Sequence, residues 1–171
     1  MKTSGILMFS SALLLSGPAA RAQEKMDHCG AASDRHAQGD ARGDKVMGFD
    51  HAKTTHHFLL SAAGGSIEVT ANRAEDQESR DAIRGHLAHI AKMFSDGDFE
   101  APMLVHDRVP PGVDAMKRKK SVIQWKYEEI GSGARIVAVT RDPEALSAIH
   151  EFLRFQIADH RTGDPGTVKA R

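Results

Sequence analysis

The sequence predicts an α+β fold in which two ββα repeats form one four-stranded antiparallel sheet with two helices on one face. Three observations predict it. Two pairs of segments rich in β-forming residues are each joined by a turn that contains glycine. A long amphipathic segment follows each pair, with apolar residues at the three- and four-residue spacing of a helix. The two halves of the chain have the same element order, so one unit is used twice.

Residues 1–22 have the features of a secretory signal peptide. Lys2 supplies a positively charged start, residues 6–15 are largely apolar, and Ala20-Arg21-Ala22 forms an A-x-A cleavage site before Gln23. The apolar stretch is too short for a spanning helix, and no later stretch is long and apolar enough. We therefore expect a periplasmic or secreted protein without a membrane anchor, whose mature chain begins at Gln23.

Composition narrows the classes of function. The chain has 23 basic and 23 acidic residues, and the first 22 residues contain two of the basic ones and no acidic one. The remaining 21 basic and 23 acidic residues give a net charge of −2, which offers no electrostatic basis for binding nucleic acid. The single cysteine cannot form an internal disulfide, so stability must come from a packed core. Ten histidines are the main anomaly of the composition.

The domain organisation follows from where apolar periodicity begins and stops. The stretch at 23–53 contains Gly, Ala, Asp, Arg and His without such periodicity, and we expect it to form a flexible His-containing arm. The α+β domain is expected at 54–165. Its parts are repeat 1 at 54–98, a connector at 99–120 and repeat 2 at 121–165, and a tail follows at 166–171.

In the first repeat, strands are predicted at 54–61 and 66–71. Between them, Ala62-Ala63-Gly64-Gly65 is expected to form a turn whose glycines supply the positive φ of a tight turn. A helix is predicted from about Asp76 to Phe94, and Gly97 suits a left-handed residue at its end. The core stripe of this helix consists of Ile83, Leu87, Ile90 and Phe94.

The connector is expected to contain an extended piece at 102–106 and one or two helical turns at 113–120. The second repeat then has predicted strands at 121–129 and 135–140. Asp142 begins its helix as an N-cap residue, followed by proline at the first helical position and an acidic residue in the first turn. The core stripe of this helix consists of Leu146, Ile149, Leu153 and Ile157.

Six motifs resemble those of one protein family. They are Thr55-His56-His57-Phe58, the stretch from His86 to Phe94, Gly97-Asp98-Phe99, Pro102-Met103, Pro110-Pro111-Gly112-Val113 and the stretch from His150 to Ile157. Together they resemble a family of small exported bacterial proteins of unassigned function, some of which carry the name aspartate carbamoyltransferase. The resemblance covers about residues 48–165. We reject the activity that this name implies, because carbamoyltransferases have a Ser-Thr-Arg-Thr phosphate loop at a helix N-terminus and this chain has none.

A candidate metal site lies beside the core stripe of the first helix. His86, His89 and Met93 follow one another at spacings of three and four residues, so their side chains are neighbours. Imidazole and thioether together suit copper, especially Cu(I). Three connector residues are candidates to complete the set: Met103, His106 and Met116. The alternative is that Met93 fills a gap in the core and both histidines are half-buried polar residues.

Three further histidines belong to the candidate site. His56 and His57 alternate across their strand, so only one of them can face the helices. His150 lies beside the core stripe of the second helix, opposite His86 when the repeats are aligned. A buried neutral histidine needs a partner, so one of the strand histidines, His86 and His150 are candidates for a buried polar cluster. That cluster would bind a metal or axially ligate haem, without covalent attachment because no Cys-x-x-Cys-His motif exists.

The leading functional hypothesis is a periplasmic copper-binding protein that acts as a chaperone, buffer or sensor. The alternatives are a metal-free dimeric module that binds a partner or small ligand, and a haem-binding protein. Phe152 and Phe155 lie about 120° and about 180° from the core stripe of their helix, which indicates a covered surface, either a subunit contact or a groove between helices, and we expect a homodimer. Because no common hydrolase or phosphate-binding motif is present, we expect a binding protein rather than an enzyme. Convergence of the methionines on the histidines would favour copper.

Overall fold

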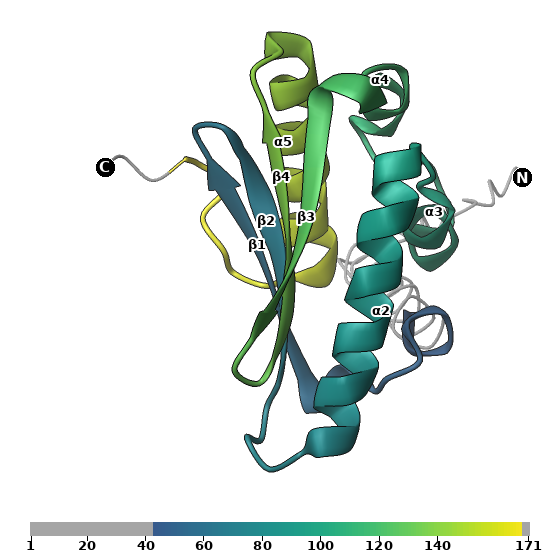
Figure 1. Ribbon diagram of the computed structural model, residues 1–171, viewed down its shortest axis with the longest axis vertical. Coiled ribbons are helices and arrows are strands. Elements are labelled where there is room, and N and C mark those ends of the chain that lie inside the picture. The colour runs from purple at the N-terminus through teal and green to yellow at the C-terminus, as the bar shows by residue number, and fades with distance from the viewer. Residues whose placement is uncertain (1–42, 169–171) are drawn as a thin grey trace, which may run out of the picture. The chain divides into compact units, whose positions relative to one another are not determined.

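The computed structural model describes residues 43–168 as two β-hairpins, each followed by a long helix (Figure 1). The predicted signal peptide and most of the predicted arm lie outside the described residues. The strands are β1 (Thr54–Ser61), β2 (Gly64–Ala71), β3 (Ile123–Ile130) and β4 (Gly133–Thr140). The helices are α2 (Gln77–Asp96), α3 (Glu100–His106), α4 (Val113–Arg118) and α5 (Pro143–His160), with short 3-10 turns at His51–Lys53 and Lys120–Val122.

The two hairpins join through their second strands into one antiparallel sheet. β2 pairs with β4, with Ile67 opposite Ile136, and the strand order is β1-β2-β4-β3. Side chains alternate between the two faces of each strand. On the inner face, Phe58 and Val69 are buried together with Ile136, which makes this face the floor of the core. The predicted α+β fold with a four-stranded antiparallel sheet is confirmed.

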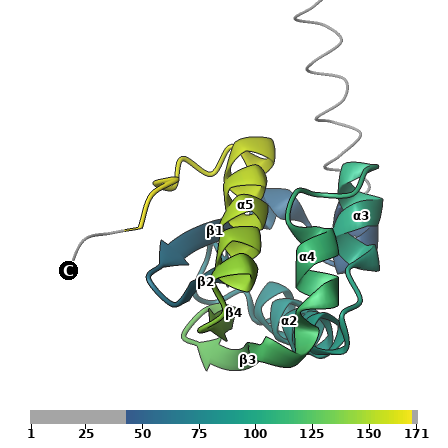
Figure 2. The same cartoon turned by 90° about the horizontal axis from the view of Figure 1, so that it is seen from above.

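Both long helices cover the same face of the sheet, and the connector helices α3 and α4 lie beside them (Figure 2). Each long helix packs mainly on the hairpin of the other repeat. Helix α2, which follows β1 and β2, lies chiefly against β3 and β4, whereas α5 lies chiefly against β1 and β2. The core is therefore shared between the repeats rather than divided between them.

The ends of the long helices form as the sequence predicts. Asp76 caps α2 by accepting a hydrogen bond from the backbone N–H of Ser79 at 3.0 Å, and Gly97 ends it with a φ of 79°. Asp142 caps α5 in the same way, accepting from the backbone N–H of Ala145 at 2.9 Å. Local sequence alone is sufficient for such caps, because each partner lies three residues away.

The first hairpin differs from its prediction at the two glycines. Its turn is only Ala62-Ala63, and both glycines belong to β2. A Cβ atom on Gly64 would collide with the backbone carbonyl of Ala138 on β4, and one on Gly65 would collide with the side chain of Leu153 on α5. Gly64 has the expected positive φ, at 148°, and Gly65 does not; both glycines allow the close approach of neighbouring elements.

The connector is more helical than predicted. Residues 102–106, expected to be extended, belong to α3, and the proline at 102 lies in its first turn, where no intrahelical N–H is required. The helical turn expected after the Pro-Pro-Gly sequence is present as α4, which buries Met116 completely. Within residues 43–168, no helix is both long enough and apolar enough to cross a bilayer.

The buried face of α5 is wider than its predicted stripe. Phe152 is only 2% exposed and packs edge-on against Phe94 and Phe99, so its predicted outward orientation is wrong. The reason is that Phe94 of α2 and Phe99 before α3 cover this part of α5, while α4 packs against α5 near Ala148, where a Cβ on Gly112 would collide with the backbone. Of the two aromatic residues on which the homodimer prediction depends, only Phe155 remains partly exposed.

Candidate ligand-binding pocket

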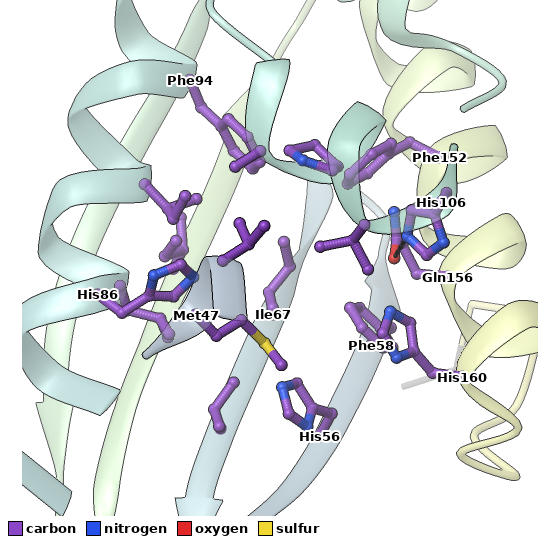
Figure 3. Close-up of a pocket in the computed structure, with 18 of the residues that line it drawn as sticks. Met47, His56, Phe58, Ile67, His86, Phe94, His106, Phe152, Gln156 and His160 are labelled. Carbon is purple, nitrogen blue, oxygen red and sulfur yellow. Dashed lines mark hydrogen bonds between the residues drawn. The ribbon is translucent and has the colours of Figure 1, made fainter. Parts of the chain in front are cut away.

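A pocket lies over the inner face of the sheet, between α2 and α5 (Figure 3). Its empty volume is about 610 Å³, part of it open to solvent. Of the nineteen lining residues within 43–168, fourteen are apolar, and they come from the sheet, α2, α3, α5 and the segment before β1. The polar residues are four histidines and a glutamine: His56, His86, His106, Gln156 and His160. This combination is typical of sites for small organic molecules.

His56 reaches the pocket from the inner face of β1. Its ring stacks between Phe49 and Phe58, with centroid distances of 6.1 and 6.4 Å. Its Nε2 atom is buried and has no hydrogen-bond partner among residues 43–168. Burial, followed by the charge on His160, lowers the pKa of His56 from 6.5 to about 3. The ring is therefore neutral at neutral pH, and its buried nitrogen is left for a ligand.

His86 enters from α2 on the other side of Phe49. The two rings meet edge to face with their centroids 5.6 Å apart. Burial, and then the charge on His89, lowers the pKa of His86 to about 4. A neutral imidazole offers a lone pair as well as an N–H group, so this wall can accept a hydrogen bond or coordinate a metal.

His106 connects the pocket to a carboxylate on α5. Its Nδ1 lies 2.7 Å from an Asp159 carboxylate oxygen, and Arg108 donates to the other oxygen at 3.1 Å. Burial opposes ionisation of Asp159, but the hydrogen bond from His106 and the charge of Arg108 outweigh it and lower the pKa. The Nε2 atom of His106 lies 2.9 Å from the side-chain oxygen of Gln156. The Nε2 atom of Gln156 is buried without a partner.

His160, at the end of α5, lies between two of these rings. Its ring stacks on that of His56 with centroids 5.7 Å apart and meets that of His106 edge to face at 5.1 Å. Three imidazoles thus form a row along one side of the pocket. Together with His86 on the opposite wall, they give an otherwise apolar pocket several hydrogen-bonding groups.

Of the predicted helical stripe, only His86 lines the pocket. His89 is exposed, and Met93 packs at the edge of the core. The pocket is also not lined by the connector methionines Met103 and Met116, although His106 lines it. The predicted convergence of these three methionines on the histidines is therefore not found in this pocket.

The other two predicted histidines are placed elsewhere. His57 points away from the pocket and its Nδ1 lies 2.8 Å from a carboxylate oxygen of Asp164. His150 donates from Nε2 to the backbone carbonyl oxygens of Ser61 and Gly64, at 2.9 and 3.0 Å. It therefore fixes the first hairpin onto α5. Of the proposed buried cluster, His56 and His86 share the pocket and His150 does not.

Three pocket residues were missed because their positions carry no periodic signal. Met47 and Phe49 lie in the segment assigned to the flexible arm, yet both line the pocket. Gln156 lies within α5 beside the predicted core stripe, where a polar residue gives no reason to expect burial. The two apolar residues Met47 and Phe49, a few residues before the first strand, are the signal that could have placed this segment against the core.

A second cluster lies on the surface. Within residues 43–168, ligand atoms of three or more His, Cys, Asp or Glu side chains come within 4.8 Å of one another only at Asp44, Asp50 and His51. One carboxylate of this group, that of Asp44, already accepts hydrogen bonds from the backbone N–H and ring of His51. These contacts stabilise the chain before β1.

Comparison of the protein with protein-family models, curated proteins and solved structures finds no match. The functional argument therefore depends on the chemistry of the pocket itself. Among residues 43–168, no lining residue is Ser, Thr, Cys, Lys, Asp or Glu, so the polar groups that this part of the chain contributes to the walls are imidazoles and an amide. Such walls favour binding through apolar contact and a few hydrogen bonds.

Proposed function

We propose that the protein binds one small, mostly apolar organic molecule in the pocket between α2 and α5. The observation that carries this proposal is the pair of buried polar atoms without partners, Nε2 of His56 and Nε2 of Gln156, in otherwise apolar walls. Each unpartnered buried group costs about 1 to 3 kcal/mol of stability. A ligand that hydrogen-bonds with both atoms would recover that cost on binding.

Apolar contact alone should contribute too little binding free energy for high affinity, so the two polar contacts are needed as well. Burying about 300 Å² of apolar surface, counted over ligand and wall together, contributes about 7 to 8 kcal/mol. Association costs several kcal/mol in lost freedom of motion, so apolar contact alone gives weak binding. Hydrogen bonds to His56 and Gln156 would add both affinity and orientation.

The proposal is tested with bicyclic aromatic probes of the size of naphthalene, measured by isothermal titration calorimetry. Ala101 lies on the pocket wall and is half-buried, so Ala101→Trp should fill the space and weaken one-to-one binding at least about tenfold. Ala88 is exposed on α2, and Ala88→Trp is the matched control, with unchanged affinity expected. If naphthalene, 1-naphthol and 1-naphthylamine all fail to bind the wild type, the proposal is wrong.

A soft metal ion is a second candidate, favoured by one observation. Met47, His56 and His86 point into the same part of the pocket in Figure 3. A thioether and two neutral imidazoles form a ligand set suited to Cu(I), so the copper proposal is kept with Met47 in place of Met93. If the ligand were haem, its iron would be coordinated by the same imidazoles, those of His56 and His86.

Titration with Cu(I) against a chelator of known affinity separates the metal from the organic ligand. Met47→Leu should weaken Cu(I) binding at least about tenfold, whereas Met103→Leu, outside the pocket, should leave it unchanged. Equal curves for the wild type and both variants would exclude this ligand set. Elemental analysis and the visible absorption spectrum of protein purified from its native source then report on copper and haem respectively.

A further inference from the structure

His106 lies at one end of the pocket, and a carboxylate on α5 determines which of its ring nitrogens donates a hydrogen bond. Asp159 is ionised, because the hydrogen bond from His106 and the charge of Arg108 lower its pKa, and a carboxylate can only accept hydrogen bonds. His106 therefore donates its Nδ1–H to Asp159, across the distance of 2.7 Å. The side chain of His106 is only 2% exposed, whereas that of Asp159 is 33% exposed, so the imidazole is buried and the carboxylate is partly open to water.

The other nitrogen of His106 determines how the amide of Gln156 is oriented. Where Nε2 of His106 accepts a hydrogen bond, the NH₂ group of Gln156 faces it and the carbonyl oxygen points away from the ring. Where Nε2–H donates, it faces that oxygen, which lies 2.9 Å away, and the NH₂ group points away from the ring instead. The two orientations differ by a half turn of the amide. Gln156 is 3% exposed, so in both states one polar atom lacks a protein partner.

We propose that the ligand carries a hydroxyl group, as an alcohol or a phenol, that hydrogen-bonds with the amide of Gln156; this inference rests on the proposed function. A hydroxyl both donates and accepts, so it satisfies the amide in either orientation. A ketone pairs only with the NH₂ group and a cationic amine only with the carbonyl oxygen. Gln156 is the specificity residue, and His106 with Asp159 positions it.

The inference is tested with three probes of nearly equal shape: naphthalene, 1-naphthol and 1-methoxynaphthalene. The wild type should bind 1-naphthol at least about tenfold more tightly than naphthalene, or about 1.4 kcal/mol. In Gln156→Leu this preference, taken as the ratio of the two affinities in the same variant, should fall below roughly threefold. Gln124→Leu, on the exposed side of β3, is the matched control and should keep the full preference. If Gln156→Leu fails to fold, Gln156→Met takes its place in this test.

The role of His106 and Asp159 in positioning Gln156 is tested by changing the preferred orientation of the Gln156 amide. In Asp159→Asn the carboxylate that holds the Nδ1 proton becomes an amide, which removes the preference for one tautomer of His106. The ratio of 1-naphthol to 1-methoxynaphthalene affinity should then change at least about threefold with naphthalene affinity unchanged, which a merely structural role would not produce.

The outcomes separate this inference from the proposed function. Equal binding of 1-naphthol and naphthalene by the wild type would overturn the hydroxyl inference and leave the ligand pocket intact. A preference that persists in both Gln156 variants would overturn the assignment of Gln156. Binding of none of the probes would overturn the proposed function as well.

Discussion

Replacing His56 by phenylalanine should make the protein more stable while removing a ligand-binding group. The ring already lies among Phe49, Phe58 and His160, so a phenylalanine has apolar neighbours, and the adjacent pocket leaves space for it. Loss of the unpartnered Nε2 atom should raise the free energy of unfolding by about 1 to 3 kcal/mol at neutral pH. Stability gained by removing a polar group is typical of functional positions.

The same substitution should change how stability depends on pH. The pKa of His56 is lowered from 6.5 to about 3 in the folded protein, so the unfolded chain binds a proton there at a pH where the folded chain does not. Stability of the wild type therefore falls as the pH drops from about 6.5 towards about 3. Between about pH 7.5 and pH 4.5 this one group accounts for about 2 to 3 kcal/mol, which His56→Phe should abolish.

Guanidinium unfolding at about pH 7.5, 6 and 4.5 measures both effects. The difference between His56→Phe and the wild type should widen towards acid, because only the wild type pays the proton-linked cost at this site. His89→Ala is the control: this side chain is exposed, so the substitution should change stability by less than about 1 kcal/mol at neutral pH. Parallel pH profiles, or a variant less stable than the wild type at pH 7.5, would refute the reasoning.

Three further predictions concern other parts of the chain. Intact-mass measurement of the exported protein should give a chain that begins at Gln23, and recovery of the full-length chain would contradict the signal peptide. Gly65→Ala should destabilise the protein by about 2 kcal/mol or more in denaturant unfolding, because its Cβ would collide with Leu153, whereas Gly85→Ala, with open space around it, should not. If the protein is a homodimer, Phe155→Asp should sediment as a folded monomer, and a wild type that is already monomeric at micromolar concentration would contradict the prediction.

The parts of the fold that were predicted correctly depend on neighbours in sequence. The start of α5 at Asp142 and Pro143 needs only the backbone N–H three residues away, so local sequence is sufficient. The role of Gly65 was predicted incorrectly because its constraints come from the packing of Leu153, which is distant in sequence, and of the Leu59 carbonyl oxygen on the paired strand. The burial of Phe152 was likewise missed because it depends on Phe94 and Phe99, which are distant in sequence.

The pocket was harder to predict than the fold for the same reason. Histidine enrichment and the flank of α2 led to His86, and strand alternation left His56 as one of two choices. Met47 and Gln156 carry no periodic signal. Both line the pocket only because the segment before β1 and the end of α5 cover the same part of the sheet. Spacing along one helix cannot indicate a site built from several separate segments.

Each long helix packs on the hairpin of the other repeat. This arrangement bears on how the chain arose and on where it can be cut into fragments. A single ββα unit of about 45 residues would leave its own helix largely uncovered and would be marginally stable alone. Two copies that exchange their helices would cover both, so the present chain has the architecture of such an exchanged pair fused by residues 99–120. A cut in the exposed stretch Asp107–Val109 should therefore yield two fragments that are unfolded apart and fold when mixed.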